Sequence, residues 1–297
     1  MRRSVALQQQ TRDSIEEELA ARIRIHQQRI ARLKIARART AAAGAPPQPL
    51  VMLAHGDSWF DYPLSGNSLS LEDTDVIAHL RTMGNLNPII LNVSHYSDSS
   101  TDEMSWPKQR LMIDALQDPA NWMATGQPDA ILFSGGGNDV AGDQFCIYLN
   151  SAPAASSLNL ERFELALDGV EASYLDLLAF RDHYAPDVPV FAHCYDFAIP
   201  NGRHPDCVGP WLKPSFDFNG WHNLAENTAT VQQVLTLFKE MLAALAQDAS
   251  KNFNLIDTQG VLVPDDWANE LHPFPSGFGK IAGRFVNALR EKFPSRI

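Results

Sequence analysis

Cysteine is scarce in this sequence of 297 residues, which contains only Cys146, Cys194 and Cys207. Three cysteines cannot all pair within one chain, and none of them has the close paired spacing of a zinc site. We therefore expect neither a disulfide framework nor a structural zinc, and a reducing compartment is the simplest environment for the protein.

Long hydrophobic runs are missing as well. No stretch approaches the ~20 apolar residues that a membrane-spanning helix needs. Arg2 and Arg3 are followed by Gln8, Gln9 and Gln10, where a secretory signal needs an apolar segment. Both absences lead us to expect a cytoplasmic protein.

Basic residues are few outside the amino-terminal region. The chain has 24 Lys and Arg against 35 Asp and Glu, a net charge of −11. Residues 1–45 hold ten basic and four acidic residues, a net +6, which leaves 14 basic and 31 acidic residues, a net −17, in the remainder. A body this acidic is a poor surface for nucleic acid, so we expect no nucleic-acid partner.

Residues 11–43 have the apolar spacing of one long helix, with a stripe formed by Ile15, Leu19, Ile23, Ile30 and Leu33. Residues 43–47, Ala-Gly-Ala-Pro-Pro, end the helix. We therefore predict a basic amphipathic helical extension over residues 1–45, followed by one domain over 46–297. The helix has three open uses: self-association in a homo-oligomer, docking on an anionic surface through residues 22–39, or packing across its own domain.

The body alternates between short apolar runs and helical patterns. Strands are predicted at 50–55, 88–93, 129–133, 189–194 and 253–257, and helices at 73–84, 100–117, 160–184, 224–249 and 277–293. This alternation predicts an α/β fold with a parallel sheet covered by helices on both faces. Residues 197–223, rich in Pro and aromatic residues, interrupt it and form either an aromatic wall over a substrate groove or a surface loop.

Polar residues follow several of the predicted strands, at the sheet edge where open α/β folds bind ligands. They lie in Gly56-Asp57-Ser58, in residues 94–101 and in Gly136-Gly137-Asn138-Asp139, and a further group, Asn269-Glu270-Leu271-His272-Pro273, lies near the carboxyl terminus. A serine nucleophile needs a base within hydrogen-bond reach and donors for the developing oxyanion. Ser58 as nucleophile, His272 as base and the Asn138 amide as a donor meet this need.

These segments resemble the SGNH (GDSL-type) hydrolase family. Gly56-Asp57-Ser58 is similar to the family's first block, with Trp59 in place of the usual Leu. Gly136-x-Asn138-Asp139 is similar to the third block, and the residues around His272-Pro273 to those around the final histidine. The blocks occur in family order, and the resemblance covers about residues 50–292.

The resemblance implies a flavodoxin-like three-layer α/β/α fold and ester hydrolysis through an acyl-serine intermediate. It implies that Ser58 attacks, that His272 is the base, and that the Ser58 N–H, the Asn138 side chain and another backbone N–H form the oxyanion hole. Ser97 stands where the family's second block usually has a glycine donor. Asn269 stands where an aspartate is usual, so Asp265, Asp266 or Glu270 is an alternative source of charge for His272.

We expect Asp57, Gly136 and Asp139 to support the site, the two aspartates by accepting backbone N–H bonds that brace the loops. His55, His95 and His222 are more typical of structural histidines. No metal and no cofactor is expected. The predicted function is a serine esterase (carboxylic ester hydrolase) acting on a small-molecule ester with a short acyl or acetyl group. The alternatives are a lysophospholipase or thioesterase, or a catalytically weak fold used for binding.

Overall fold

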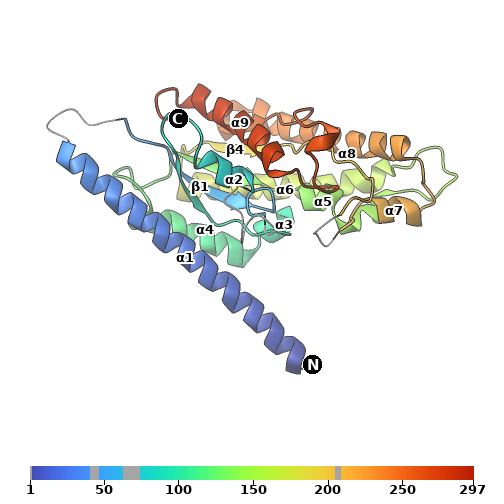
Figure 1. Ribbon diagram of the computed structural model, residues 1–297, viewed down its shortest axis with the longest axis horizontal. Helices are drawn as coiled ribbons and strands as arrows, with labels where there is room; N and C mark the ends of the chain where they lie inside the picture. The colour runs from blue at the N-terminus through green and yellow to red at the C-terminus, as the bar shows by residue number, and fades with distance from the viewer. Residues whose placement is uncertain (1, 41–46, 63–73, 205–208) are drawn as a thin grey trace.

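A computed structural model describes residues 2–40, 47–62, 74–204 and 209–297 (Figure 1). Its centre is a sheet of five parallel strands in the order β2-β1-β3-β4-β5. The strands are β1 Val51–Gly56, β2 Ile89–Asn92, β3 Ala130–Ser134, β4 Val190–His193 and β5 Phe253–Ile256. All five lie where the apolar runs predicted them, and the parallel α/β fold is confirmed.

The strands are apolar on both faces because helices cover both sides of the sheet. Every residue of β1, β3 and β4 is buried. In a parallel sheet such strands read as continuous hydrophobic runs, which is why they could be found in the sequence. Parallel pairing also places the ends of neighbouring strands together, with Gly56 of β1 opposite Ser134 of β3.

Helices form the two outer layers. On one face α2 (Val76–Leu80) packs against α9 (Pro275–Lys292), and Phe285 of α9 contacts His193 of β4, with ring centroids 5.6 Å apart. On the other face lie α6 (Leu160–Tyr184) and α8 (Leu224–Gln247), and Tyr174 of α6 contacts Phe133 of β3 at 5.1 Å. The expected three-layer arrangement is thus confirmed.

The predicted helices differ from the observed ones mainly at their ends. The helix expected over 100–117 is divided into α3 (Ser100–Glu103) and α4 (Trp106–Gln117), because Ser105 caps a new helix with Pro107 in its first turn. Two short helices were not predicted: α5 (Gly137–Ala141), and α7 (Lys213–Phe218) within the expected loop 197–223.

The amino-terminal helix α1 (Arg2–Thr40) is longer than predicted and lies partly against the body. Ile30 is fully buried, and the imidazole of His26 bonds the carbonyl of Asn121 at 2.8 Å. The helix contacts β2, so it covers an edge strand of the sheet. Its first part extends away from the body in Figure 1. Packing across its own domain is therefore one use of α1, and self-association stays a prediction.

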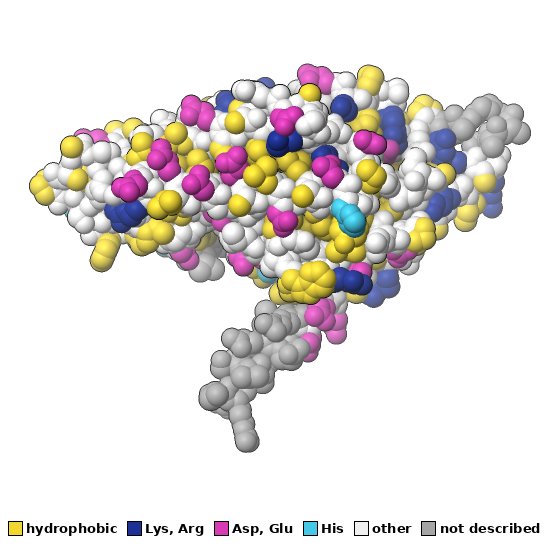
Figure 2. All heavy atoms as spheres, turned by 180° about the vertical axis from the view of Figure 1, so that it is seen from behind, with side chains coloured by type: hydrophobic (Ala, Val, Ile, Leu, Met, Phe, Trp, Pro, Cys, Tyr) yellow, Lys and Arg dark blue, Asp and Glu magenta, His cyan; other side chains and the backbone are white. Residues whose placement is uncertain are grey.

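The charge asymmetry of the sequence is visible on the surface. Asp and Glu side chains are spread over the face in Figure 2, whereas many Lys and Arg lie toward the end of the molecule where α1 ends. Within the described residues, no helix is both long and apolar enough to cross a membrane.

Candidate active site

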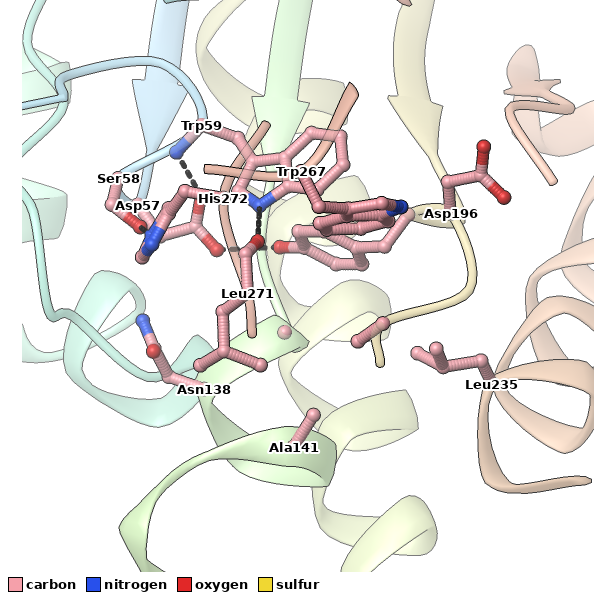
Figure 3. Close-up of a pocket in the computed structure, with 13 residues that line it drawn as sticks. Asp57, Ser58, Trp59, Asn138, Ala141, Asp196, Leu235, Trp267, Leu271 and His272 are labelled. Carbon is pink, nitrogen blue, oxygen red and sulfur yellow. Dashed lines mark hydrogen bonds between the residues drawn. The ribbon is translucent and has the colours of Figure 1, made fainter. Parts of the chain in front are cut away.

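Ser58 and His272 meet at the carboxyl edge of the sheet. Ser58 follows β1 directly, and His272 lies in the loop before α9 (Figure 3). The Oγ of Ser58 is 2.7 Å from Nε2 of His272, although the two residues are 214 positions apart in sequence. Both side chains are buried. The structure therefore brings together the predicted nucleophile and base at hydrogen-bond distance.

Asn269 fixes the tautomer of His272. Its Oδ1 accepts hydrogen bonds from the backbone N–H groups of Leu271 (3.0 Å) and His272 (2.9 Å), and its Nδ2 donates to the hydroxyl of Tyr62 (3.2 Å). These contacts orient the amide, so the atom 3.1 Å from Nδ1 of His272 is an oxygen. Nδ1 must then carry the hydrogen, which leaves the Nε2 lone pair free to accept from Ser58.

No carboxylate among the described residues contacts the His272 ring. Asp266 forms an ion pair with Lys280 at 2.6 Å, and Glu270 bonds backbone groups of another loop. Asp265 is exposed. Burial lowers the pKa of His272 from 6.5 to about 3. The imidazole is therefore neutral near pH 7, as a general base must be, but no neighbouring charge stabilises its protonated form.

The predicted oxyanion donors follow three strands, β1, β2 and β3. Asn138 stands in the first turn of α5, and its Nδ2 donates to the carbonyl of Asp98 at 2.8 Å, which leaves its second N–H available. Ser97 has a φ of 68°. This left-handed conformation suits glycine and costs a serine on the order of 1 kcal/mol, which matches the glycine usual at that position of the family.

Gly136 and Asp139 hold the Asn138 loop in place. Gly136 has a φ of 98°, and a Cβ there would lie 2.7 Å from the Phe238 ring, so neither the backbone nor the space admits another residue. The carboxylate of Asp139 accepts from the N–H (2.7 Å) and the hydroxyl (3.1 Å) of Ser100. The second and third sequence blocks are joined by this contact.

Asp57 is the centre of a buried polar network that the sequence did not reveal. It accepts from the N–H of Trp59 (3.0 Å), the hydroxyl of Ser134 (2.7 Å) and the hydroxyl of Tyr195 (2.6 Å). Ser134 also lies 2.8 Å from Nε2 of His193. Burial raises the pKa of Asp57 to about 6, against the lowering effect of these bonds. The network fixes the turn that carries Ser58. In the sequence, this network is indicated only by a polar residue at the end of β3 (Ser134) and one at the end of β4 (His193).

Aromatic side chains fasten the His272 loop. The indole N–H of Trp59 donates to the carbonyl of Leu271 at 3.2 Å, which joins the serine and histidine loops. The rings of Tyr62 and Trp211 lie 4.8 and 5.5 Å from that of His272. Trp211 belongs to the segment 197–223, so part of that segment lies beside the site.

Next to the pair is a small cavity of about 30 Å³. Figure 3 shows Asn138, Leu271, Ala141 and Leu235 along it. Its surface is mostly apolar, although Asn138 and Asp196 line it as well as Ser58 and His272, and it has room for only a small group.

The three histidines expected to be structural lie apart from this pair. His55 is fully buried, with Nε2 3.0 Å from the carbonyl of Glu103. His95 lies 3.7 Å from Asp98, and His222 is an exposed residue 3.3 Å from Asp217. In the described part of the chain, no cluster of three or more His, Cys, Asp or Glu is arranged to hold a metal ion.

Solved structures with the same architecture are lipases and esterases. A lipase from a goat rumen metagenome matches with a TM-score of 0.53 and 14% identity over 80% of this chain and 97% of its own. The chain shares the fold of this lipase. An acetylxylan esterase from Geobacillus stearothermophilus (TM-score 0.48, 15% identity, 82% of this chain and 95% of its own) also matches. So does a member of the lipolytic G-D-S-L family from Veillonella parvula (TM-score 0.45, 15% identity, 80% and 96%). No protein-family model and no curated protein matches the sequence.

Proposed function

We propose that this protein is a serine esterase that hydrolyses a carboxylic ester with a short acyl group. The observation that carries the proposal is the 2.7 Å contact between Ser58 Oγ and Nε2 of an imidazole whose tautomer Asn269 fixes. A serine is activated when a neutral base accepts its proton during attack. The resemblance of its sequence blocks to SGNH hydrolases and the fold that it shares with the goat rumen lipase support the same class of reaction.

In the proposed acylation step, Ser58 Oγ attacks the acyl carbon while its proton passes to Nε2 of His272. The carbonyl oxygen becomes an oxyanion held by the N–H groups of Ser58 and Ser97 and by the Asn138 amide. The intermediate collapses, the C–O bond to the alcohol breaks, and His272 returns the proton to the leaving oxygen.

Deacylation repeats the step with water. His272 takes a proton from water, the hydroxide attacks the acyl-serine, and the carboxylic acid leaves as the proton returns to Ser58 Oγ. Because Asn269 supplies the correct tautomer but no negative charge, the imidazolium formed in each step is less stable than beside a carboxylate. We therefore expect a modest turnover number.

The size of the cavity favours a small acyl group. Its volume of about 30 Å³ accommodates an acetyl-sized group, whereas a lysophospholipase or acyl thioesterase must hold a long chain. A binding module is the other alternative, and the missing carboxylate beside His272 is the observation that favours it. In this proposal the segment of Trp211, which lies beside His272, contacts the alcohol part of the ester.

A ladder of p-nitrophenyl esters, from acetate upward in chain length, tests the proposal with wild type and Ser58→Ala. EDTA is present throughout. We expect activity that is highest with acetate, falls with chain length and is lost in Ser58→Ala. Activity that rises with chain length would favour the lipid hydrolases, and equal activity in both proteins would exclude Ser58 as nucleophile.

A further inference from the structure

A second cavity lies away from Ser58, between α1, the end of α2 and β2. Its volume is about 190 Å³, and its lining consists of Arg22, Ile25, His26, Arg29, Arg81 and Ile90. Three of these six side chains are guanidinium groups. Such a concentration of positive charge is unusual in a chain whose net charge is −11.

One of the three arginines has its charge balanced within the protein. Arg22 forms ion pairs with Glu18 and with Asp61, the latter at 2.6 Å, and also donates to the carbonyl of Ser94 at 3.2 Å. Arg29 and Arg81 have no ion pair within the described residues. Their charges act on each other and on His26.

Arg81 uses little of its bonding capacity. Of its five N–H donors, one is engaged in a protein hydrogen bond, from Nη2 to the carbonyl of Ile90 at 3.1 Å. Its Nε is buried and has no hydrogen-bond partner within the described residues. Asp75 and Asp61 attract it without forming an ion pair with it, and burial raises the pKa of Asp75 to about 7. A partly buried guanidinium with so few hydrogen-bond partners lowers the stability of the fold.

His26 adds a second unmatched group. The side chain is only 3% exposed, its Nε2 faces the Asn121 carbonyl, and its Nδ1 has no partner within the described residues. Since a carbonyl only accepts, Nε2 carries the hydrogen of the neutral ring. Burial, with the charges of Arg81 and Arg29, lowers the pKa of His26 to about 4, so Nδ1 becomes a further donor only when a bound anion raises that pKa.

We propose that this cavity binds a phosphate group, through Arg29 and Arg81 with His26 beside them. Guanidinium groups bind tetrahedral oxyanions through paired N–H donors, and several acceptor oxygens are needed to satisfy more than one arginine. The phosphate is either inorganic or part of a larger monoester. Because Arg29 comes from α1 and Arg81 follows α2, the ligand joins the amino-terminal helix to the body.

The test is isothermal titration calorimetry of the full chain with inorganic phosphate, at an ionic strength held constant with chloride. The informative variant is Arg29→Gln, because Arg29 is exposed and has no recorded hydrogen bond whose loss would disturb folding. Arg32→Gln is the matched control, since Arg32 is exposed on the same helix and outside the cavity lining. Loss of one charge-assisted contact weakens binding about tenfold or more.

The proposal predicts saturable phosphate binding by wild type and Arg32→Gln, weakened about tenfold in Arg29→Gln. Glycerol 3-phosphate identifies the source: binding as tight as that of phosphate indicates a monoester, and much weaker binding indicates inorganic phosphate. The absence of saturable binding in wild type, or equal affinities in the two variants, would overturn the proposal. Neither result depends on esterase activity.

Discussion

Among single residues, Asn269 is the one that contacts Nδ1 of His272, and in the proposed mechanism it sets how strongly His272 acts as a base. Its Oδ1 holds the Nδ1 hydrogen, so the geometry of a catalytic triad is present without the negative charge. When a triad loses its carboxylate, the rate falls most if the histidine then carries its hydrogen on the nitrogen that must accept from serine. Here the neighbouring N–H groups of residues 271 and 272 prevent that.

Replacing Asn269 with Asp is expected to raise kcat about tenfold. A carboxylate beside Nδ1 stabilises the imidazolium and raises the pKa of His272 from its value of about 3 by a unit or more. The acid limb of the kcat/KM profile must therefore move to higher pH, because the histidine now becomes protonated, and loses its function as base, earlier as the pH falls. The measurement is the pH profile of ester hydrolysis for both proteins.

Asn269→Ala is the companion variant for that profile. It removes both the orientation and the backbone contacts, so its kcat should fall below that of wild type. If Asn269→Asp and wild type give the same rate and the same acid limb, the position does not act on His272 in the reaction.

Sequence patterns pointed to the proposed catalytic residues more readily than to the residues that hold them in place. Ser58, Asn138 and His272 stood out because each lies in a short polar block at a fixed place relative to strands and Pro or Gly. Ser134, His193 and Tyr195 did not, because their hydrogen bonds to Asp57 and to one another join residues 59 or more positions apart and leave no local pattern. Only the folded chain shows that they support the turn of the nucleophile.

At the scale of elements, Glu270 organises the segment that begins after β4. Its buried carboxylate accepts from four backbone N–H groups, those of residues 202, 211, 212 and 213, at 2.7–3.0 Å. The segment then places Trp211 next to His272. The sequence suggested Glu270 as a charge for His272, whereas the structure shows it holding this loop.

Glu270→Gln should lower the free energy of unfolding by about 2 kcal/mol and reduce activity. The neutral amide oxygen is a weaker acceptor than a carboxylate oxygen. The amide NH₂ group cannot accept hydrogen bonds, so the backbone N–H groups that face it lose their acceptor. Urea unfolding and ester kinetics measure the two effects. Glu240→Gln on the exposed side of α8 is the control and should change neither. Unchanged stability in Glu270→Gln would show that the four bonds contribute little.

Strand positions were predictable, whereas short helices were not. The five strands are apolar runs of the right length between turn residues, and α6 has the bounds 160–184 that its periodicity predicted. α5 has only five residues and begins beside Gly136, and α7 begins with Lys213-Pro214 in a Pro-rich segment. Tertiary contacts stabilise such short helices, so their own sequences contain little signal.

At the scale of the whole molecule, α1 is joined to the body of the protein through a buried contact. Ile30 is 0% exposed and belongs to the main hydrophobic core, whereas Ile35 on the same helix is 54% exposed. The sequence showed the apolar stripe of this helix but not its partner, because a stripe suits a second copy or the same chain equally well.

Ile30→Ala should destabilise the protein by about 3 kcal/mol, through lost burial and the cavity that remains. If α1 and the body unfold as one cooperative unit, circular dichroism and tryptophan fluorescence both show a single urea transition. Its midpoint is then lowered equally in both measurements. Ile35→Ala is the matched control and should have little effect on the midpoint. Equal midpoints for the two variants would mean that the helix does not stabilise the domain.

The most direct test of the central claim is labelling with a fluorophosphonate probe, followed by mass spectrometry of the modified peptide. The probe reacts with a serine that a neighbouring base activates, whatever the natural ester is. We expect a single labelled residue, Ser58, and no labelling in Ser58→Ala or after unfolding. A folded wild-type protein that the probe does not modify would contradict the assignment of this site as a serine hydrolase and would favour a binding module.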